Sequence, residues 1–324
     1  MPVAFITGIT GQDGSYLAES LASQGVEVHG LVRSHDDRAA EQGHVHPDVI
    51  LHEGDITNRE DLDRIVRSIK PSVIYNLAAV SSVYRSWAEP VNAALVNAVP
   101  VAQLLDSAWQ LQESTGSQVR FVQASSAELF GQAAESPQTE NTPIRPTSPY
   151  GAAKAYAHHM VGVYRGRGLF ASSCILYNHE SPRRPETFVT RKITAAAARI
   201  ARGQQNTLEL GTLDVRRDWG WAPDYAHALE LAAASETADD FVIATGQTHS
   251  IADFARLAFA RAGLDWQEYV SVDKSIARPV DPSEQVGDAT RARTVLGWQP
   301  TKSFEEIVEA MVDNDLALAD SALS

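Results

Sequence analysis

The sequence contains very little cysteine and no long apolar run. Cys174 is the only cysteine among 324 residues, so no disulfide can form within the chain and no cysteine-rich zinc site can be built. No stretch approaches the roughly 18 consecutive apolar residues of a membrane-spanning helix, and the first residues form no basic leader. We therefore expect a cytoplasmic protein with no membrane partner.

Basic residues are also scarce relative to acidic ones. The chain has 27 lysines and arginines against 41 aspartates and glutamates, a formal net charge of -14. This balance repels phosphate backbones, so we expect no nucleic-acid partner. The clustered histidines His44, His46 and His52 and the adjacent pair His158 and His159 lack the spacing of a metal site, and we expect no metal.

Short apolar runs alternate with longer amphipathic segments through the first half of the chain. Parallel strands cannot be joined by a tight turn, so this pattern predicts parallel strands connected by crossover helices. The expected strands are 3–7, 26–32, 49–52, 73–77, 120–124 and 171–176, and the expected helices are 15–23, 60–68, 90–112 and 150–165. Pro100 should kink the third helix or split it in two. The sequence predicts a Rossmann-type, doubly wound α/β fold.

The regular alternation ends near residue 177, where prolines begin to separate shorter elements. Clear later helices are expected at 251–262 and 304–318. We predict a first domain at 1–176, with a returning segment near 212–240. A smaller C-terminal, substrate-binding lobe is expected at 177–211 and 241–324.

Three glycines follow the first predicted strand: Gly8, Gly11 and Gly14. A dinucleotide-binding turn needs glycine for the tight turn, for the approach of a pyrophosphate and for helix packing, and the pyrophosphate lies at the helix N-terminus. Gln12 and Asp13 lie in the same turn. A strand-to-helix turn without a ligand is the alternative, but the position between a strand and a helix at the start of an alternating sheet favours cofactor binding.

Arg33 lies at the end of the second predicted strand, where an acidic residue would bind the ribose of NAD. An arginine there can pair with a 2'-phosphate, which favours NADP over NAD. The alternative is a solvated Arg33, with Asp36 or Asp37 contacting the ribose. Further cofactor contacts are predicted at the ends of the third and fourth strands: Asp55, Ile56, Leu77 and Ala78. For Asp55, a simple helix N-terminal carboxylate is the alternative.

Ser148 and Pro149 mark the start of a helix, as N-cap and first helical residue. Tyr150 and Lys154 then stand four residues apart on one helical face. An ammonium close to a phenol lowers the phenol's pKa, which predicts a tyrosine that acts as a base. A chance surface pair is the alternative.

Ser126 and Glu128 follow the fifth predicted strand, at the carboxyl edge where doubly wound sheets bind ligands. Ser126 can donate a hydrogen bond to a substrate oxygen. Glu128 would be a second proton acceptor beside the tyrosine, and simple alcohol oxidation needs only one. The alternatives are turn chemistry for the serine and a solvated loop position for the glutamate.

Five stretches together resemble a known family: TGITGQDGS (7–15), SSAELFG (125–131), SPYGAAK (148–154), NHESPRRPETFVTRKIT (178–194) and RDWG (217–220). With them the chain resembles the extended short-chain dehydrogenase/reductases, and within these the GDP-mannose 4,6-dehydratase family. The resemblance covers nearly the whole chain. It implies that the first domain binds NADP and that the second lobe binds a nucleotide sugar.

The resemblance also implies roles for individual residues. Tyr150 would be the base at the sugar's 4-hydroxyl, Lys154 would tune it, Ser126 would touch the substrate, and Glu128 would be the acid/base at C5 and C6. The implied substrate contacts are Ser81, Asn178, Lys192, Arg217 and Arg278. The implied reaction is dehydration of GDP-mannose to GDP-4-keto-6-deoxymannose with transient hydride transfer to bound NADP, in a homodimer or homotetramer.

Some positions depart from the family pattern. Val80-Ser81-Ser82-Val83 stands where the family usually reads Gln-Ser-His-Val, close to the expected sugar pocket. The alternatives are therefore a dehydratase, epimerase or reductase acting on another nucleotide sugar, such as a GDP-heptose. A non-catalytic NADP-binding regulator would need only the glycine loop.

Overall fold

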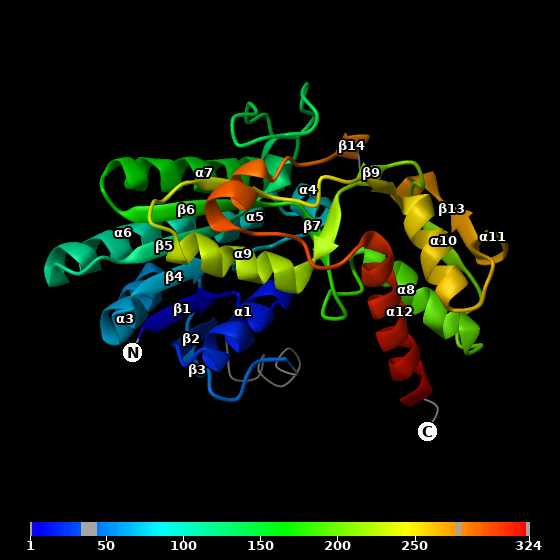
Figure 1. The fold of residues 1–324 in the computed structure, drawn as a ribbon, viewed down its shortest axis with the longest axis horizontal. Helices are drawn as coiled ribbons and strands as arrows, with labels where there is room; N and C mark the ends of the chain where they lie inside the picture. Colours follow the sequence, from blue (N-terminus) through cyan, green and yellow to red (C-terminus); the bar gives the residue numbers. More distant parts are fainter. Residues whose placement is uncertain (1, 34–43, 277–279, 322–324) are drawn as a thin grey trace.

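A computed structural model describes residues 2–33, 44–276 and 280–321. Its centre is a seven-stranded parallel sheet in the order β11-β6-β5-β4-β1-β2-β3 (Figure 1). All six predicted strands are present, with ends within two residues of those predicted: β1 Val3–Thr7, β2 Glu27–Val32, β3 Ile50–Glu53, β4 Val73–Asn76, β5 Arg120–Ser126 and β6 Phe170–Leu176. The predicted parallel sheet is confirmed.

The seventh strand, β11 Asp240–Ile243, comes from the second half of the chain. It pairs with β6 in parallel, Phe241 opposite Cys174. The structure thus places residues 241–243 of the predicted second lobe in the large sheet. Residues 213–221 of the predicted returning segment also differ from the prediction, because Trp219 and its apolar neighbours pack with the core of the second lobe. The remainder of the predicted domain division stays a prediction.

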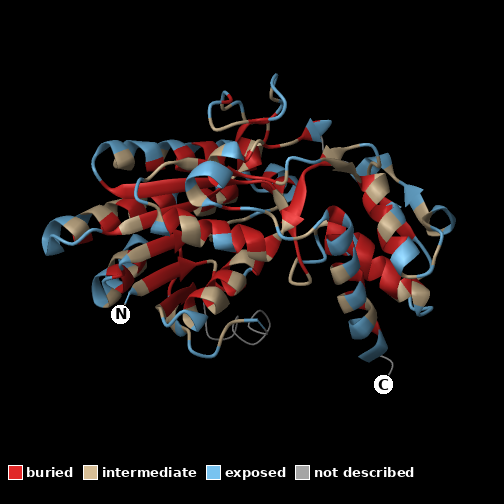
Figure 2. Ribbon diagram, in the orientation of Figure 1, coloured by how far each residue is buried: buried red, intermediate tan, exposed pale blue. Residues whose placement is uncertain are grey.

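Helices cover both faces of the sheet, as a doubly wound fold requires. On one face α1 Gln12–Ser23 packs against α9 Ala222–Ala234, and their apolar side chains share a core with β1 and β6. The other face carries three helices: α3 Arg59–Ile69, α6 Val99–Thr115 and α7 Pro149–Gly166. Figure 2 shows the buried residues concentrated in the strands between these layers.

The predicted helix over residues 90–112 is split, as expected from Pro100. Helix α5 spans Pro90–Asn97, and Ala98 is its C-cap. Helix α6 begins at the next residue, Val99, with Pro100 in its first turn. A proline is tolerated there because the first-turn amides have no partner within the helix. A short helix that was not predicted, α4 Val83–Ala88, precedes them.

The C-terminal part builds a second core beside the sheet. Three helices pack around it: α8 Val189–Ala201, α10 Ile251–Arg261 and α12 Phe304–Ser321. Its short strands are β7 Asn178–Glu180 with β10 Trp219–Trp221, β8 Leu208–Leu210 with β13 Val270–Val272, and β9 Arg216–Arg217 between β12 His249–Ser250 and β14 Glu284–Gln285. The helix α11 Trp266–Tyr269 is a single turn. Within the described ranges, no helix combines the length and apolar character needed to cross a bilayer.

Candidate active site

The glycine turn connects β1 directly to α1, as predicted. Gly8 has φ +72°, and a Cβ atom there would lie 2.7 Å from the backbone nitrogen of Ala78. A Cβ atom on Gly14 would lie 2.2 Å from the carbonyl oxygen of Gly8. Both positions therefore require glycine. Gly11 caps α1 without a side-chain hydrogen bond, which leaves the helix N-terminus open to an anion.

Buried polar side chains align the ends of three neighbouring strands beside this turn. The Thr7 hydroxyl donates to Asn76 Oδ1 (2.6 Å) and accepts from the amides of Leu77 and Ala78 (3.2 Å each). Asn76 Nδ2 in turn donates to Gln123 Oε1 (2.9 Å). Leu77 and Ala78 thus lie against the glycine turn. Their predicted contact with a cofactor would require this position.

The other predicted cofactor residues lie at the ends of β2 and β3. Arg33 is exposed directly after β2, while Asp36 and Asp37 lie outside the described residues. The Asp55 carboxylate accepts hydrogen bonds from the amide and hydroxyl of Thr57, both at 2.8 Å. Ile56 is buried in the core under α3. Asp55 therefore stabilises the turn before α3, and its contact with a cofactor stays a prediction.

The structure confirms the predicted start of α7. The Ser148 hydroxyl accepts a hydrogen bond from the amide of Gly151 (3.0 Å), and Pro149 is the first helical residue. The Tyr150 amide donates to Ser86 Oγ of α4 (3.2 Å), which fixes the helix start against its neighbour. Tyr150 is therefore held by a capped and anchored helix end.

Tyr150 and Lys154 lie together on the buried side of α7, only 7% and 3% exposed. Lys154 Nζ lies 5.8 Å from the centroid of the Tyr150 ring and donates a hydrogen bond to the carbonyl oxygen of Ala124 (2.9 Å). Burial lowers the pKa of Lys154 to about 8, although the charge of Asp13 acts in the opposite direction. The predicted surface-pair alternative does not apply, because both side chains are buried.

The expected lowering of the Tyr150 pKa is wrong. Burial raises the pKa of this phenol to about 12; a hydrogen bond with the Ser126 side chain lowers it, and the charge of Glu128 raises it further. The Lys154 ammonium lies over the Tyr150 ring and donates its hydrogen bond to the carbonyl oxygen of Ala124. It therefore does not offset the rise in the phenol's pKa that comes from removing water around the hydroxyl.

Ser126 and Glu128 lie beside Tyr150, at the carboxyl end of β5. The Ser126 hydroxyl accepts from the amide of Glu128 (3.3 Å) and caps the 3-10 turn Ala127–Leu129. A Cβ atom on Gly151 would lie 2.5 Å from the carbonyl oxygen of Glu128, so glycine lets the start of α7 approach this turn. The structure brings together all four predicted catalytic residues: Ser126, Glu128, Tyr150 and Lys154.

The predicted substrate residues are more dispersed. Ser81 is exposed beside the N-cap of α4, and Asn178 is half-buried in β7, opposite Trp219 of β10. Lys192 is exposed, and its Nζ donates to the carbonyl oxygen of Glu209 (2.7 Å). Arg217 is buried. Arg278 lies outside the described residues.

Arg217 is already held by neighbouring protein groups. Its guanidinium pairs with the carboxylate of Asp281 and donates to the carbonyl oxygen of Pro282 (2.9 Å). To bind a diphosphate, it would have to share or exchange these contacts. Its role as a substrate contact therefore stays a prediction.

Two side chains of the site, His179 and Arg184, are not found by sequence reasoning. His179 Nε2 lies 2.9 Å from the Asp13 carboxylate of the glycine turn. Arg184 pairs with Glu180 (3.3 Å), and its charge acts on both Tyr150 and Asp13. Both belong to the stretch 178–194 that most specifically resembles the family, which is the only sequence signal for them.

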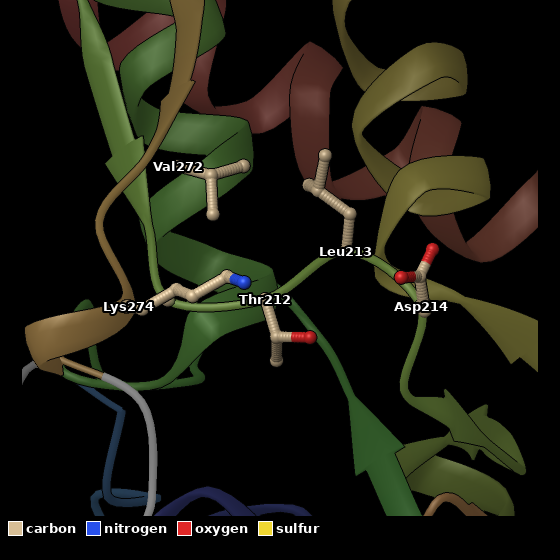
Figure 3. Close-up of a pocket in the computed structure, with 6 residues that line it drawn as sticks. Thr212, Leu213, Asp214, Val272 and Lys274 are labelled. Carbon is tan, nitrogen blue, oxygen red and sulfur yellow. The ribbon is translucent and has the colours of Figure 1, made fainter.

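A pocket of about 350 Å³ lies in the second lobe, after β8 and β13 (Figure 3). It is lined by Gly211, Thr212, Leu213, Asp214, Val272 and Lys274. The Lys274 side chain extends toward Thr212. None of the predicted site residues lines it. Among the described residues, no three histidine, cysteine or acidic side chains are grouped to hold a metal ion.

Known proteins resemble this chain over almost its full length. The family model described as GDP-mannose 4,6 dehydratase matches residues 5–311. The GDP-mannose 4,6 dehydratase 2 of Arabidopsis thaliana is 44% identical over 98% of this chain and 87% of its own length. The human GDP-mannose 4,6 dehydratase is 42% identical over 98% of this chain and 92% of its own length.

Solved structures share the architecture as well. The UDP-glucose 4-epimerase of Thermus thermophilus, determined in complex with NAD, superposes with a TM-score of 0.84 at 26% identity. The match covers 97% of this chain and 98% of that protein. Both the parallel sheet and the smaller second part are therefore shared with a nucleotide-sugar enzyme.

Proposed function

The chain belongs to the GDP-mannose 4,6-dehydratase family, and from this premise we propose that it is a lyase that converts GDP-mannose into GDP-4-keto-6-deoxymannose. The observation that carries the proposal is the convergence of Tyr150, Lys154, Ser126 and Glu128 at the carboxyl edge of the sheet, next to the glycine turn. An enzyme that only oxidised an alcohol would have no use for the carboxylate.

We propose NADP as the cofactor. The Gly8 and Gly14 turn, the open N-terminus of α1 and the adjacent Leu77 and Ala78 fit a dinucleotide pyrophosphate. Arg33 at the end of β2 supports NADP over NAD, because a guanidinium can bind a 2'-phosphate. When bound beside this turn, the nicotinamide would supply the hydride chemistry, the oxidation at C4 and the reduction at C6 of the sugar.

The proton transfers then belong to this chain's own side chains. Tyr150 Oη would accept the proton of the 4-hydroxyl as a phenolate, a form that the hydrogen bond from Ser126 and the positive charge of a bound nicotinamide would favour against its burial. The C4 ketone acidifies the C5 hydrogen, which the Glu128 carboxylate removes. Glu128 then donates this proton to the C6 hydroxyl, which leaves as water. With the hydride at C6, the proton held by Tyr150 would pass to C5, which would restore the phenolate and leave no net oxidation.

We propose that the second lobe binds the nucleotide end of the substrate. Lys192 is exposed and has one backbone contact, so its ammonium can reach a phosphate. Asn178, Arg217, Arg278 and Ser81 are retained as proposed contacts from the family resemblance. Isolated cations in an acidic protein focus a doubly charged diphosphate into one region.

The test is mass spectrometry of GDP-mannose incubated with the protein and a trace of NADP. We expect a product that has lost one water, formed in amounts far above the NADP added. An unchanged sugar nucleotide would overturn this substrate. Val80 and Ser82, on either side of Ser81, depart from the family near the expected sugar pocket, so a parallel incubation with a GDP-heptose tests the alternative substrate.

We also propose that the protein is a homodimer or a homotetramer built from it. Helix α5 packs against α7, and both helices carry exposed apolar side chains: Val91, Leu95, Tyr156 and Val163. Exposed apolar side chains on two helices that pack together are typical of an interface. In light scattering, Val91→Glu should shift the protein to a monomer. If the molar mass of the variant equals that of the wild type, any interface lies elsewhere.

We propose a cytoplasmic location. The buried free thiol of Cys174 is consistent with a reducing compartment.

A further inference from the structure

His179 must carry two ring protons in this structure. Its Nδ1 lies 2.7 Å from the carbonyl oxygen of Tyr177, and its Nε2 lies 2.9 Å from Oδ2 of Asp13. A carbonyl and a carboxylate only accept hydrogen bonds, so both nitrogens must donate. A neutral imidazole has one N–H and could satisfy only one contact. The geometry therefore requires an imidazolium.

Asp13 lies in the first turn of α1, where the positive end of the helix would also receive a diphosphate. Its other oxygen, Oδ1, accepts from Gln12 Nε2 (3.1 Å), and Gln12 Oε1 accepts from the Ser181 hydroxyl (2.8 Å). The carboxylate is thus fixed in place. A fixed negative charge beside a doubly charged ligand repels it unless a cation compensates.

We propose that His179 is a positioning residue whose imidazolium neutralises Asp13, so that the N-terminus of α1 can accept a dinucleotide diphosphate. This inference rests on the proposed cofactor site. The segment after β6, which contains His179, would then lower the negative charge beside the glycine turn. His179 lies 166 residues from Asp13 in the chain.

The surroundings of His179 favour the charged ring. The Tyr225 ring stacks on it at 4.4 Å between centroids and 25° between planes, a favourable contact for a cation. Gly220 makes room for Tyr225, since a Cβ atom there would lie 2.3 Å from that ring.

Other charges near His179 act in both directions. Burial and the charge of Arg184 lower the pKa of His179, but the charge and hydrogen bond of Asp13 outweigh them and hold it above its ordinary value. Glu180, on the same segment, is a further acidic neighbour. Because the folded pKa is raised, the compensation is complete at low pH and is lost as the pH rises through the pKa of the folded protein.

The experiment measures NADPH affinity by fluorescence titration for four proteins: wild type, His179→Gln, Asp13→Asn and the double variant. Glutamine keeps an N–H donor near Asp13 but carries no charge. We expect His179→Gln to weaken binding by about tenfold or more, because Asp13 then loses its directly hydrogen-bonded cation. The double variant should return to within about threefold of Asp13→Asn.

A double variant that binds as weakly as His179→Gln would overturn the inference, because the histidine would then act by packing or direct contact. The matched control is His158→Asn, which removes another buried histidine facing a carboxylate, Asp240 at 3.6 Å, at the far edge of the sheet. We expect the control to change the melting temperature but not the NADPH affinity.

Two further measurements do not depend on turnover or on the His179 variants. In the wild type without cofactor, the NMR signal of His179 should titrate above 6.5, and above its titration in Asp13→Asn. NADPH affinity of the wild type should fall with rising pH more steeply than that of Asp13→Asn. Equal titrations would overturn the inference. NADPH binding with this pattern but no dehydration of GDP-mannose would overturn only the proposed reaction.

Discussion

The carboxyl edge of the large sheet and the second lobe both contain predicted site residues, but they use their charged groups differently. At the sheet edge, a capped helix start carries Tyr150 and Lys154, and the charge of Glu128 acts on the Tyr150 phenol. In the second lobe, the Arg217 guanidinium is committed to Asp281. The edge therefore groups ionisable side chains suited to proton transfer, whereas Arg217 could bind a phosphate only by sharing or exchanging its protein partners.

Replacing Tyr150 by phenylalanine tests the sheet edge most strongly. The variant removes the only hydroxyl proposed to take the proton from the 4-hydroxyl, and we expect kcat to fall by about 10⁴-fold. Turnover is measured as loss of water from GDP-mannose. The control is Tyr156→Phe, an exposed tyrosine on the same helix, which should leave kcat unchanged. A Tyr150→Phe enzyme with near-normal turnover would remove the phenol from the mechanism.

Glu128→Gln separates the carboxylate's step from the tyrosine's step. The amide cannot remove the C5 proton, so we expect dehydration to fall by about 10³-fold while oxidation at C4 persists. In deuterated water, the wild type should incorporate deuterium at C5, and the variant should not. Normal deuterium incorporation by Glu128→Gln would assign the C5 proton to another base.

The features of the sheet edge that follow regular periodicity could be predicted from the sequence. Alternating apolar runs indicate the strands, glycines at 8 and 14 indicate the turn, and Ser148-Pro149 indicates the helix that carries Tyr150. Because parallel strands end at one edge of a sheet, residues that follow different strands are brought together there. The Tyr150 pKa could not be predicted, since it depends on burial by the whole surrounding structure.

The second lobe could be predicted much less well, because its contacts are irregular and distant in sequence. Asn178 pairs with Trp219 through two three-residue strands, too short to give a periodic pattern. The bond between Asp13 and His179 joins residues that no local spacing relates. Arg217 and Lys192 look alike as cations in the sequence, yet one is buried in an ion pair and the other is exposed.

Arg217→Gln tests whether this difference in burial decides what a cation does. The variant removes the buried guanidinium that pairs with Asp281, so we expect the free energy of unfolding to fall by about 3 kcal/mol. The control is Arg216→Gln on the same strand, whose ion pairs at 3.6 and 3.8 Å are partly exposed and should contribute at most about 1 kcal/mol. Denaturant titration measures both. Unchanged stability with a raised KM would show that Arg217 serves the substrate instead.

Lys192→Ala is expected to have the smallest effect, and it acts on binding alone. Its Nζ contacts only a backbone carbonyl among the described residues, so removal should leave the melting temperature unchanged. Loss of one charge-assisted hydrogen bond to a phosphate should raise the KM for GDP-mannose by about tenfold, with kcat retained. Arg199→Ala on the same helix removes a surface ion pair with Glu186 and should leave KM unchanged. Equal KM values for both variants would mean that the diphosphate lies away from this face of α8. Exposure of a cation in the second lobe would then not indicate a substrate contact.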